Sequence, residues 1–238
     1  MIPGSGTALS LFSHLFSRSC LSCGEKSRHR DLCPDCENDP IWSYPPREMV
    51  RGERRVRIVY LDAGPVARLF RLAKNRGNRK AMDILFDRAR LSALVPDSAK
   101  LLLPVPPSKS RLIRRDLAIP DAFAFRVHRF GSVPVSFSGL VRTKDSPQKA
   151  RSRSERRESI FSPNFQLVPT AIADWPKEGV VLVDDLMVTG WTLRSIDNIL
   201  AREGVEVMLH LALLFREELS RPSRITPLHS PSSLLSSS

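Results

Sequence analysis

The stretch "VVLVDDLMVTGWTL" (residues 180–193) gives the clearest indication of the fold. A run of four apolar residues ends in two adjacent aspartates, Asp184 and Asp185, and a Thr-Gly-Trp-Thr turn then leads into an amphipathic segment. Continuously apolar strands are typical of parallel sheets that are covered on both faces, and ligands bind beyond the carboxyl ends of such strands. The stretch therefore predicts a buried strand that ends at a ligand site.

The residues after the aspartates have the composition of a phosphate site. Thr189, Gly190 and Thr192 open the next predicted helix, whose N-terminus offers free amides to an anion. The carboxylates of Asp184 and Asp185 can accept hydrogen bonds from a vicinal diol, so the pattern predicts a ribose 5-phosphate ligand. A plainer interpretation is that Asp185 begins the loop while a threonine caps the helix. The sequence contains neither the P-loop pattern nor the Rossmann fingerprint.

The same alternation of strand and helix continues along most of the chain. Strands are expected at residues 56–61, 100–107, 133–141, 180–183 and 205–215, and helices at residues 66–73, 81–94, 117–130 and 192–202, with Pro120 interrupting the third helix. This order predicts an α/β fold with a mostly parallel central sheet and helices on both faces.

All four cysteines fall within residues 20–36, as the pairs Cys20/Cys23 and Cys33/Cys36. Two C-x-x-C knuckles are typical of a zinc site with four thiolate ligands. A disulfide framework suits small secreted domains, and a redox pair leaves two cysteines unused. Four thiolates leave no position for a catalytic water, so zinc is expected to be structural, in a module that also serves as a candidate docking surface.

Composition bounds the remaining possibilities. The 238 residues include 42% hydrophobic ones, and no window reaches the length of a membrane span. Because the N-terminus has no basic residue before its apolar patch, a secretory signal is not expected, and a cytoplasmic protein is predicted. The net charge of +12 is concentrated in clusters at residues 68–80, 109–115 and 142–157. Such clusters favour an anionic partner, phosphorylated or nucleic acid, over a merely solvated basic surface.

These observations divide the chain into five parts. They are a leader (1–18), the four-cysteine zinc ribbon (19–40), a Pro-rich charged connector (41–55), the α/β domain (56–216) and a Ser/Pro-rich tail expected to be disordered (217–238).

Two parts of the sequence resemble known protein families. Residues 180–193 resemble the phosphoribosyl pyrophosphate (PRPP) motif of type I phosphoribosyltransferases. Together with the four-cysteine knuckle, residues 9–215 resemble the ComF family, which is associated with competence and DNA uptake in bacteria. Further likeness lies in "RLFRLAKNRG", "LLLPVPPSKSRLIRR" and "RTKDSPQKARSRSERRESIF". The matching residues are Lys74, Gly77, Pro104, Val105, Pro106, Arg111, Arg115, Arg142, Gln148, Arg156 and Phe161.

The resemblance implies roles for these residues. Asp184 and Asp185 would hold the ribose hydroxyls, and Val188, Thr189, Gly190, Trp191 and Thr192 would bind the 5-phosphate. Arg111, Arg115 and Lys74 are candidates for the pyrophosphate side, against the alternatives of a solvated basic loop and a surface lysine. Arg142, Gln148 and Arg156 would belong to a mobile flap. Magnesium would accompany PRPP, with the acids contacting it through water.

Two functions follow from the resemblance. One is transfer of the phosphoribosyl group to an amine or base, with loss of pyrophosphate through an oxocarbenium-like transition state. The other is non-catalytic binding of PRPP, of single-stranded DNA or of a helicase-like partner.

The sequence also departs from the family pattern. The family's Gly-Phe-Asn-Gln is replaced by residues 116–120, its asparagine by Ser159, and a small residue by Trp191, which either narrows the pocket or points outward. No histidine lies in a motif, so His14, His29, His128, His210 and His229 are expected to be structural or exposed.

Overall fold

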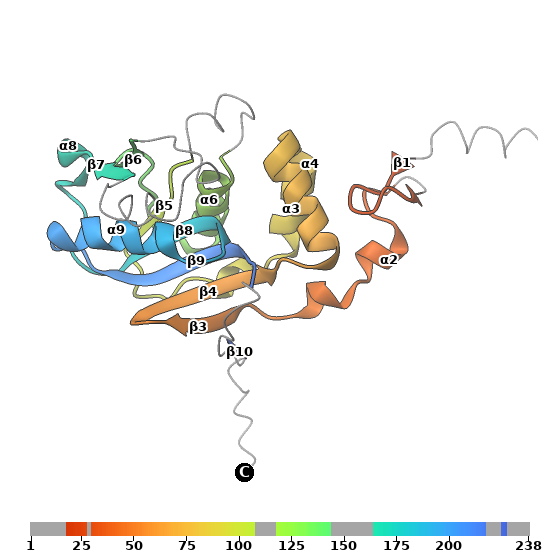
Figure 1. Ribbon diagram of the computed structural model, residues 1–238, viewed down its shortest axis with the longest axis horizontal. Coiled ribbons are helices and arrows are strands. Elements are labelled where there is room, and N and C mark those ends of the chain that lie inside the picture. Colours follow the sequence, from red (N-terminus) through yellow and green to blue (C-terminus); the bar gives the residue numbers. More distant parts are fainter. Residues whose placement is uncertain (1–17, 28–29, 108–117, 144–163, 218–224, 228–238) are drawn as a thin grey trace, which may run out of the picture.

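A six-stranded sheet forms the centre of the computed structural model, which describes residues 18–27, 30–107, 118–143, 164–217 and 225–227 (Figure 1). The strand order is β10-β3-β4-β9-β8-β5. Its strands are β3 (Arg47–Arg51), β4 (Arg54–Leu61), β5 (Leu101–Pro104), β8 (Val180–Met187), β9 (Val207–Phe215) and β10 (Ile225–Pro227). Strands β4, β9, β8 and β5 are parallel, whereas β3 is antiparallel to β4 and β10 is antiparallel to β3. The predicted α/β class with a mostly parallel sheet is confirmed.

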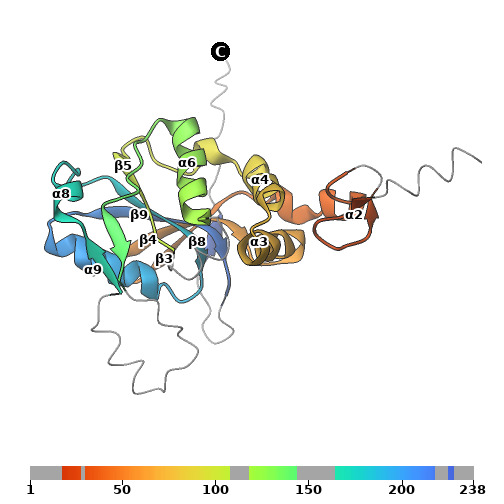
Figure 2. The ribbon, with the colours of Figure 1, turned by 90° about the horizontal axis from the view of Figure 1, so that it is seen from above.

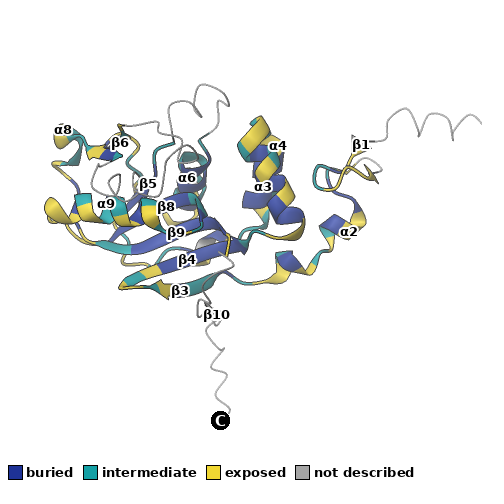
Figure 3. Cartoon of the chain, in the orientation of Figure 1, coloured by how far each residue is buried: buried dark blue, intermediate teal, exposed yellow. Residues whose placement is uncertain are grey.

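Helices cover both faces of this sheet (Figures 1 and 2). They are α3 (Gly64–Arg76), α4 (Arg79–Arg88), α6 (Ile119–Gly131) and α9 (Trp191–Arg202). Val181 and Val183 of β8 pack into the core beneath α3, α4 and α6. Val180 and Leu182 point the other way, into the core beneath α9 and the small sheet of β6 (Leu140–Arg142) and β7 (Phe165–Leu167). Both faces of the central strands are therefore buried (Figure 3), as their continuous apolar sequence predicts.

The helix ends follow local chemistry. Helix α3 ends at Gly77, whose φ of 63° lies in the left-handed region that glycine adopts most readily. The Asn78 side chain then accepts a hydrogen bond of 2.8 Å from the amide of Ala81 and so caps α4. Pro120 does not interrupt α6 but lies in its first turn, where a proline has no helical hydrogen bond to lose.

Several predicted boundaries differ from the structure. The helix expected at 81–94 ends at Arg88 and is followed by the 3-10 helix η2 (Leu91–Ala93). Most of the strand expected at 133–141 is irregular, with one bridge from Val135 to Leu102 before β6 begins. The 41–55 connector includes β3, and β10 lies within the tail. These strands are short and show little apolar alternation, which is why their sequence does not reveal them.

The four-cysteine module lies at one end of the molecule, beside α3 and α4 (Figure 2). It contains β1 (Arg18–Ser19), β2 (Lys26–Ser27), α2 (Pro34–Glu37) and the 3-10 helix η1 (Pro40–Ser43). Cys33 and Cys36 share a core cluster with residues of α3 and α4, so the module packs onto the α/β domain. Ion pairs from Lys80 to Asp31 and from Arg88 to Glu37 cross the same boundary.

A short helix, α8 (Pro169–Ile172), precedes β8. Among the described helices, none has the length and apolar character needed to cross a bilayer.

Candidate functional site

The two aspartates lie near the carboxyl end of β8, which continues for two residues beyond them to Met187. Asp184 pairs with Ala212 of β9 in a parallel register, so both acids are on the ordered sheet and not in a loop. Because neighbouring residues on a strand point to opposite faces, their side chains start in opposite directions. The structure thus places the acid pair at the edge where ligands of parallel sheets bind.

Asp184 is the more deeply buried of the two, with 8% of its surface exposed. Its Oδ1 accepts a hydrogen bond of 2.7 Å from the backbone amide of Asp185. Burial, followed by the charge of Asp185, raises the pKa of Asp184 to about 7, although Lys74 and Arg142 act in the opposite direction. Close to neutral pH, Asp184 is therefore poised between a carboxyl group that donates and a carboxylate that only accepts.

Asp185 is paired with Lys74. The ammonium nitrogen Nζ lies 2.8 Å from Oδ1 and 2.6 Å from Oδ2 of Asp185. Both side chains are only 15–16% exposed, and Nζ also lies 5.1 Å from the centre of the Phe70 ring. The structure does not leave Lys74 on the surface, which is the plainer alternative for this residue, but brings it to the acid pair. The pyrophosphate contact that the resemblance implies stays a prediction.

The loop after β8 leads directly into α9. Gly190 is the N-cap residue, with a φ of 76° in the left-handed region, and no side chain caps the helix at this position. The first hydrogen bond of the helix runs from the Arg194 amide to the Gly190 carbonyl at 3.0 Å, so the amides of Thr192 and Leu193 precede it. The Thr189 hydroxyl accepts a long hydrogen bond of 3.5 Å from the Trp191 amide, so the plainer interpretation of a threonine cap holds in part. The amides of Thr192 and Leu193 remain for an anion.

Two arginines hold this loop in place. Arg51, the last residue of β3, donates a hydrogen bond of 3.1 Å from Nη1 to the Val188 carbonyl, and its guanidinium stacks 5.1 Å from the Phe215 ring. The backbone amide of Arg216 donates to the Met187 carbonyl at 3.0 Å. Sequence reasoning missed Arg51, because it lies 137 positions from Val188 in a segment with no apolar period. No local pattern marks such a contact.

Trp191 lies at the first position of α9 and is 47% exposed. The guanidinium of Arg194, one turn later, lies 5.2 Å from the centre of its ring. The indole does not pack into the core, so the sequence departure at this position leaves an aromatic surface beside the loop.

Other predicted residues are only partly described. Arg142 ends β6, and its Nε donates a hydrogen bond of 3.2 Å to the carbonyl of Pro106, which follows β5. The Val105 amide donates to the Val183 carbonyl at 2.8 Å, so this segment runs beside the acid strand. Arg111, Arg115, Gln148, Arg156, Phe161 and Ser159 lie outside the described residues.

Asp121, in the first turn of α6, is a further acid that sequence reasoning missed. Because α6 follows the loop after β5, its N-terminus faces the carboxyl edge of the sheet. Burial raises the pKa of Asp121 to about 6.

The described histidines have structural partners. His128 Nδ1 lies 2.8 Å from the Val133 carbonyl, and buried His210 Nε2 lies 2.8 Å from Asp197 Oδ1. Asp197 also pairs with Arg54 of β4.

The four cysteine sulfurs all lie within 4.8 Å of one another. A zinc ion with bonds of about 2.3 Å to four sulfurs places those sulfurs about 3.8 Å apart, so the cluster is consistent with a structural zinc site. Gly24, with a φ of 83°, donates its amide to the Cys20 carbonyl at 2.9 Å and closes the first knuckle. Trp42 Nε1 donates to the Cys36 carbonyl at 2.8 Å and ties the second knuckle to η1.

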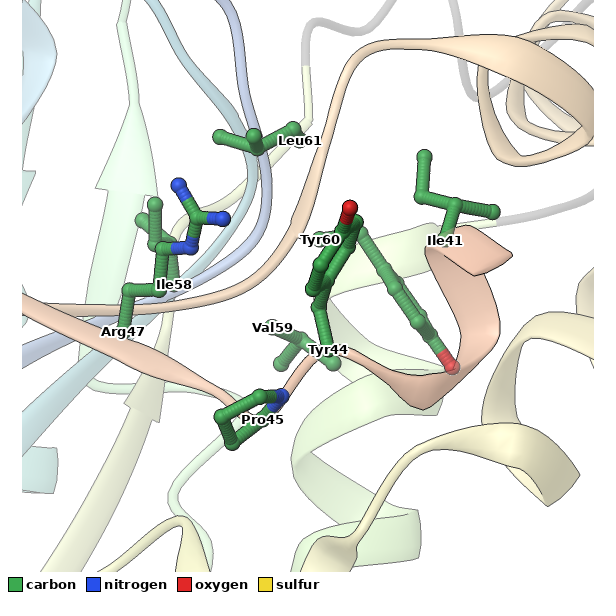
Figure 4. Close-up of a pocket in the computed structure, with 8 residues that line it drawn as sticks. All are labelled: Ile41, Tyr44, Pro45, Arg47, Ile58, Val59, Tyr60 and Leu61. Atoms are coloured by element: carbon green, nitrogen blue, oxygen red, sulfur yellow. The ribbon is translucent and has the colours of Figure 1, made fainter. Parts of the chain in front are cut away.

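Figure 4 shows the residues that line a small cavity between η1 and the β3–β4 pair. It is lined by Ile41, Tyr44, Pro45, Arg47 and residues 58–61, and its volume of about 10 Å³ holds little more than one water molecule. It is a packing defect between η1 and the β3–β4 pair and not a ligand site.

Comparison with known proteins adds little to this geometry. No family model matches the chain, and no curated protein matches it. Among solved structures, the chain is similar to one described as the allosteric regulatory enzyme of purine biosynthesis, with a TM-score of 0.32 and 22% identity. The match covers 57% of this chain and 25% of that enzyme. The α/β assignment therefore follows from the chain's own strand order and not from this likeness.

Proposed function

We propose that this chain binds a ribose 5-phosphate compound at the carboxyl edge of its sheet. The observation that carries the proposal is the placement of Asp184 and Asp185 at the end of β8, directly before a loop that opens α9 with free amides. Carboxylates accept hydrogen bonds from the ribose diol, and the amides and helix dipole attract the phosphate. Together they match the two ends of one ligand.

The finer parts of this proposal rest on the resemblance to the ComF family. With PRPP as the ligand, the group transferred would be phosphoribosyl, and the acceptor an amine or base. Arg111 and Arg115 would neutralise the departing pyrophosphate, and the segment between β6 and β7 would supply the flap with Gln148 and Arg156.

Calorimetric titration with ribose 5-phosphate tests the binding. We expect wild type to bind, the double variant Asp184→Asn/Asp185→Asn to lose at least about tenfold in affinity, and 2-deoxyribose 5-phosphate to bind more weakly because it lacks one diol hydroxyl. The double variant Asp97→Asn/Asp174→Asn makes the same two substitutions at exposed positions and should bind as wild type does. Equal binding by both double variants would refute the assignment.

A second candidate function is contact with single-stranded nucleic acid, as in the competence and DNA-uptake role that the resemblance implies. The observation that favours it is the exposed Trp191 with Arg194 stacked on its ring. Aromatic and guanidinium surfaces stack on unpaired bases at about 1–3 kcal/mol per base. Binding of oligothymidylate that falls with salt, and falls again in Trp191→Ala, supports this function; binding that ignores salt contradicts it.

A further inference from the structure

The acid pair is unusual because a cation of the protein already contacts it. Lys74 Nζ approaches both oxygens of Asp185, at 2.8 and 2.6 Å. Both partners are largely removed from solvent, so this contact is stronger than that of an exposed ion pair. An ammonium group carries three donors and can therefore hold both Asp185 oxygens while donating to a ligand oxygen as well.

The second acid is also engaged within the chain. Asp184 is buried, and its Oδ1 accepts a hydrogen bond from the Asp185 amide. Arg142 is close enough to favour its ionised form, which places a second cationic side chain near the pair. Two cationic side chains of the protein therefore lie close to the two carboxyl groups.

Magnesium, which the resemblance implies, fits this arrangement poorly. Mg²⁺ prefers ionised carboxylates in near-octahedral geometry. Here both oxygens of Asp185 are bonded to an ammonium, and one oxygen of Asp184 accepts the Asp185 amide. A divalent ion at the acid pair would have to displace Lys74 or lie directly beside it.

We propose that Lys74 takes the place of a divalent cation at the acid pair, so that the site binds the diol of a ribose 5-phosphate compound without a metal ion. This inference rests on the proposed function and adds a requirement to it. Lys74 acts as a positioning residue that fixes the Asp185 carboxylate in the orientation the diol needs. Any magnesium that enters with PRPP is then held by the pyrophosphate of the ligand and not by Asp184 and Asp185.

Ribose 5-phosphate is the appropriate probe, because it has the diol and the 5-phosphate but no pyrophosphate to carry a metal. Calorimetric titrations are run in buffer freed of divalent ions by chelating resin, and again with excess Mg²⁺. The zinc content of the full chain is measured before and after, to confirm that the cysteine module is the same in the two series. We expect the dissociation constant of wild type to change less than about twofold on adding Mg²⁺, because Lys74 already supplies the positive charge at Asp185.

Two variants complete the experiment. Lys74→Met keeps the length of the side chain and removes its charge, and Lys74→Arg keeps the charge. Without metal, Lys74→Met should lose at least about tenfold in affinity and recover part of it with Mg²⁺, whereas Lys74→Arg should stay close to wild type and remain indifferent to Mg²⁺. A merely structural role for Lys74 predicts no gain of metal dependence.

Each outcome is decisive. If wild type binds only with Mg²⁺, the inference is overturned and the proposed function stands. If ribose 5-phosphate binds in neither buffer, the proposed function itself fails. Should Lys74→Met not fold, the two wild-type titrations still decide, together with Mn²⁺ titration followed by electron paramagnetic resonance. Tight Mn²⁺ binding that Asp184→Asn/Asp185→Asn abolishes would contradict a metal-independent acid pair.

Discussion

Two clusters of side chains that can bind metal ions lie in the described part of this molecule, and they differ in the positive charge that surrounds them. In the N-terminal module, four cysteine sulfurs gather within 4.8 Å of one another, and Arg68 approaches Cys36 Sγ only at 3.8 Å from an exposed position. At the end of β8, two carboxyl groups gather beside Lys74, which contacts both oxygens of Asp185. The two clusters therefore differ in the charge that surrounds their ligand groups, and we expect only the cysteine cluster to require a metal.

The first way to test this contrast is to remove metal, and the module should respond most strongly. We expect stripping the chain of zinc to lower its thermal stability steeply, because structural zinc contributes about 10–16 kcal/mol of binding free energy in small zinc domains at neutral pH. Protease cleavage within residues 19–40 and differential scanning calorimetry measure the loss.

Adding zinc back after stripping is the control and should restore the transition. Metal analysis of freshly purified protein should give about one zinc per chain. A content far below that, with unchanged stability after chelation, would remove the contrast between the two clusters.

The second test concerns the charge of Asp184. Its pKa is raised from 3.8 to about 7, so the unfolded chain ionises this group at lower pH than the folded one. The contribution of Asp184 to the free energy of unfolding is therefore largest below about pH 4 and is lost as pH rises towards about pH 7. Asp184→Asn abolishes that loss, and we expect the variant to exceed wild type by up to a few kcal/mol at about pH 8, with the gap closing towards about pH 4.

Urea unfolding across this pH range measures the gap. The exposed variant Asp97→Asn should show none. A gap that stays constant with pH would mean that Asp184 is ionised throughout, and that burial does not raise its pKa.

A third cluster allows a further comparison. Its acid also has basic partners, but it lies away from the carboxyl edge of the sheet. Asp197 of α9 pairs with His210 and Arg54 beneath the helix. Asp197→Ala leaves both partners without this acid and should cost about 2–3 kcal/mol, somewhat less than a fully buried pair because Arg54 is 27% exposed.

Ribose 5-phosphate affinity should nevertheless stay within about threefold of wild type, because this cluster does not face the ligand edge. The exposed neighbour Asn198→Ala is the matched control and should change stability by less than about 0.5 kcal/mol. A large loss of ribose 5-phosphate affinity in a folded Asp197→Ala variant would show that this cluster contributes to the ligand site.

The smallest effect is expected at Trp191. Trp191→Ala removes a side chain that is 47% exposed and a stacking contact with Arg194, so we expect less than about 1 kcal/mol of lost stability. Trp175→Ala provides the comparison: Trp175 is 8% exposed, and its loss should cost about 3–5 kcal/mol. If the two variants lose equal stability in thermal unfolding, the indole of Trp191 packs more tightly than its exposure indicates.

Sequence reasoning found the features that depend on residues close together in the chain. The continuous apolar runs identified β4, β8 and β9, and the cysteine spacing identified the module. It could not find the partners of the acid pair. Lys74 reads as an ordinary lysine at a helix end, and Arg51 lies in a segment where Met49 is the sole buried residue of its strand. Contacts across 111 and 137 positions depend on the packing of the sheet and helices, which no local pattern encodes.

Strand β10 has a consequence for handling this protein. Its residues pair with β3 from Met49 to Arg47 and so occupy hydrogen-bonding positions that would otherwise remain open on β3. Open strands of this kind recruit one another and lead to aggregation. A chain shortened after residue 217 should therefore self-associate at high concentration, and an affinity tag belongs beyond residue 227 or at the other end of the molecule.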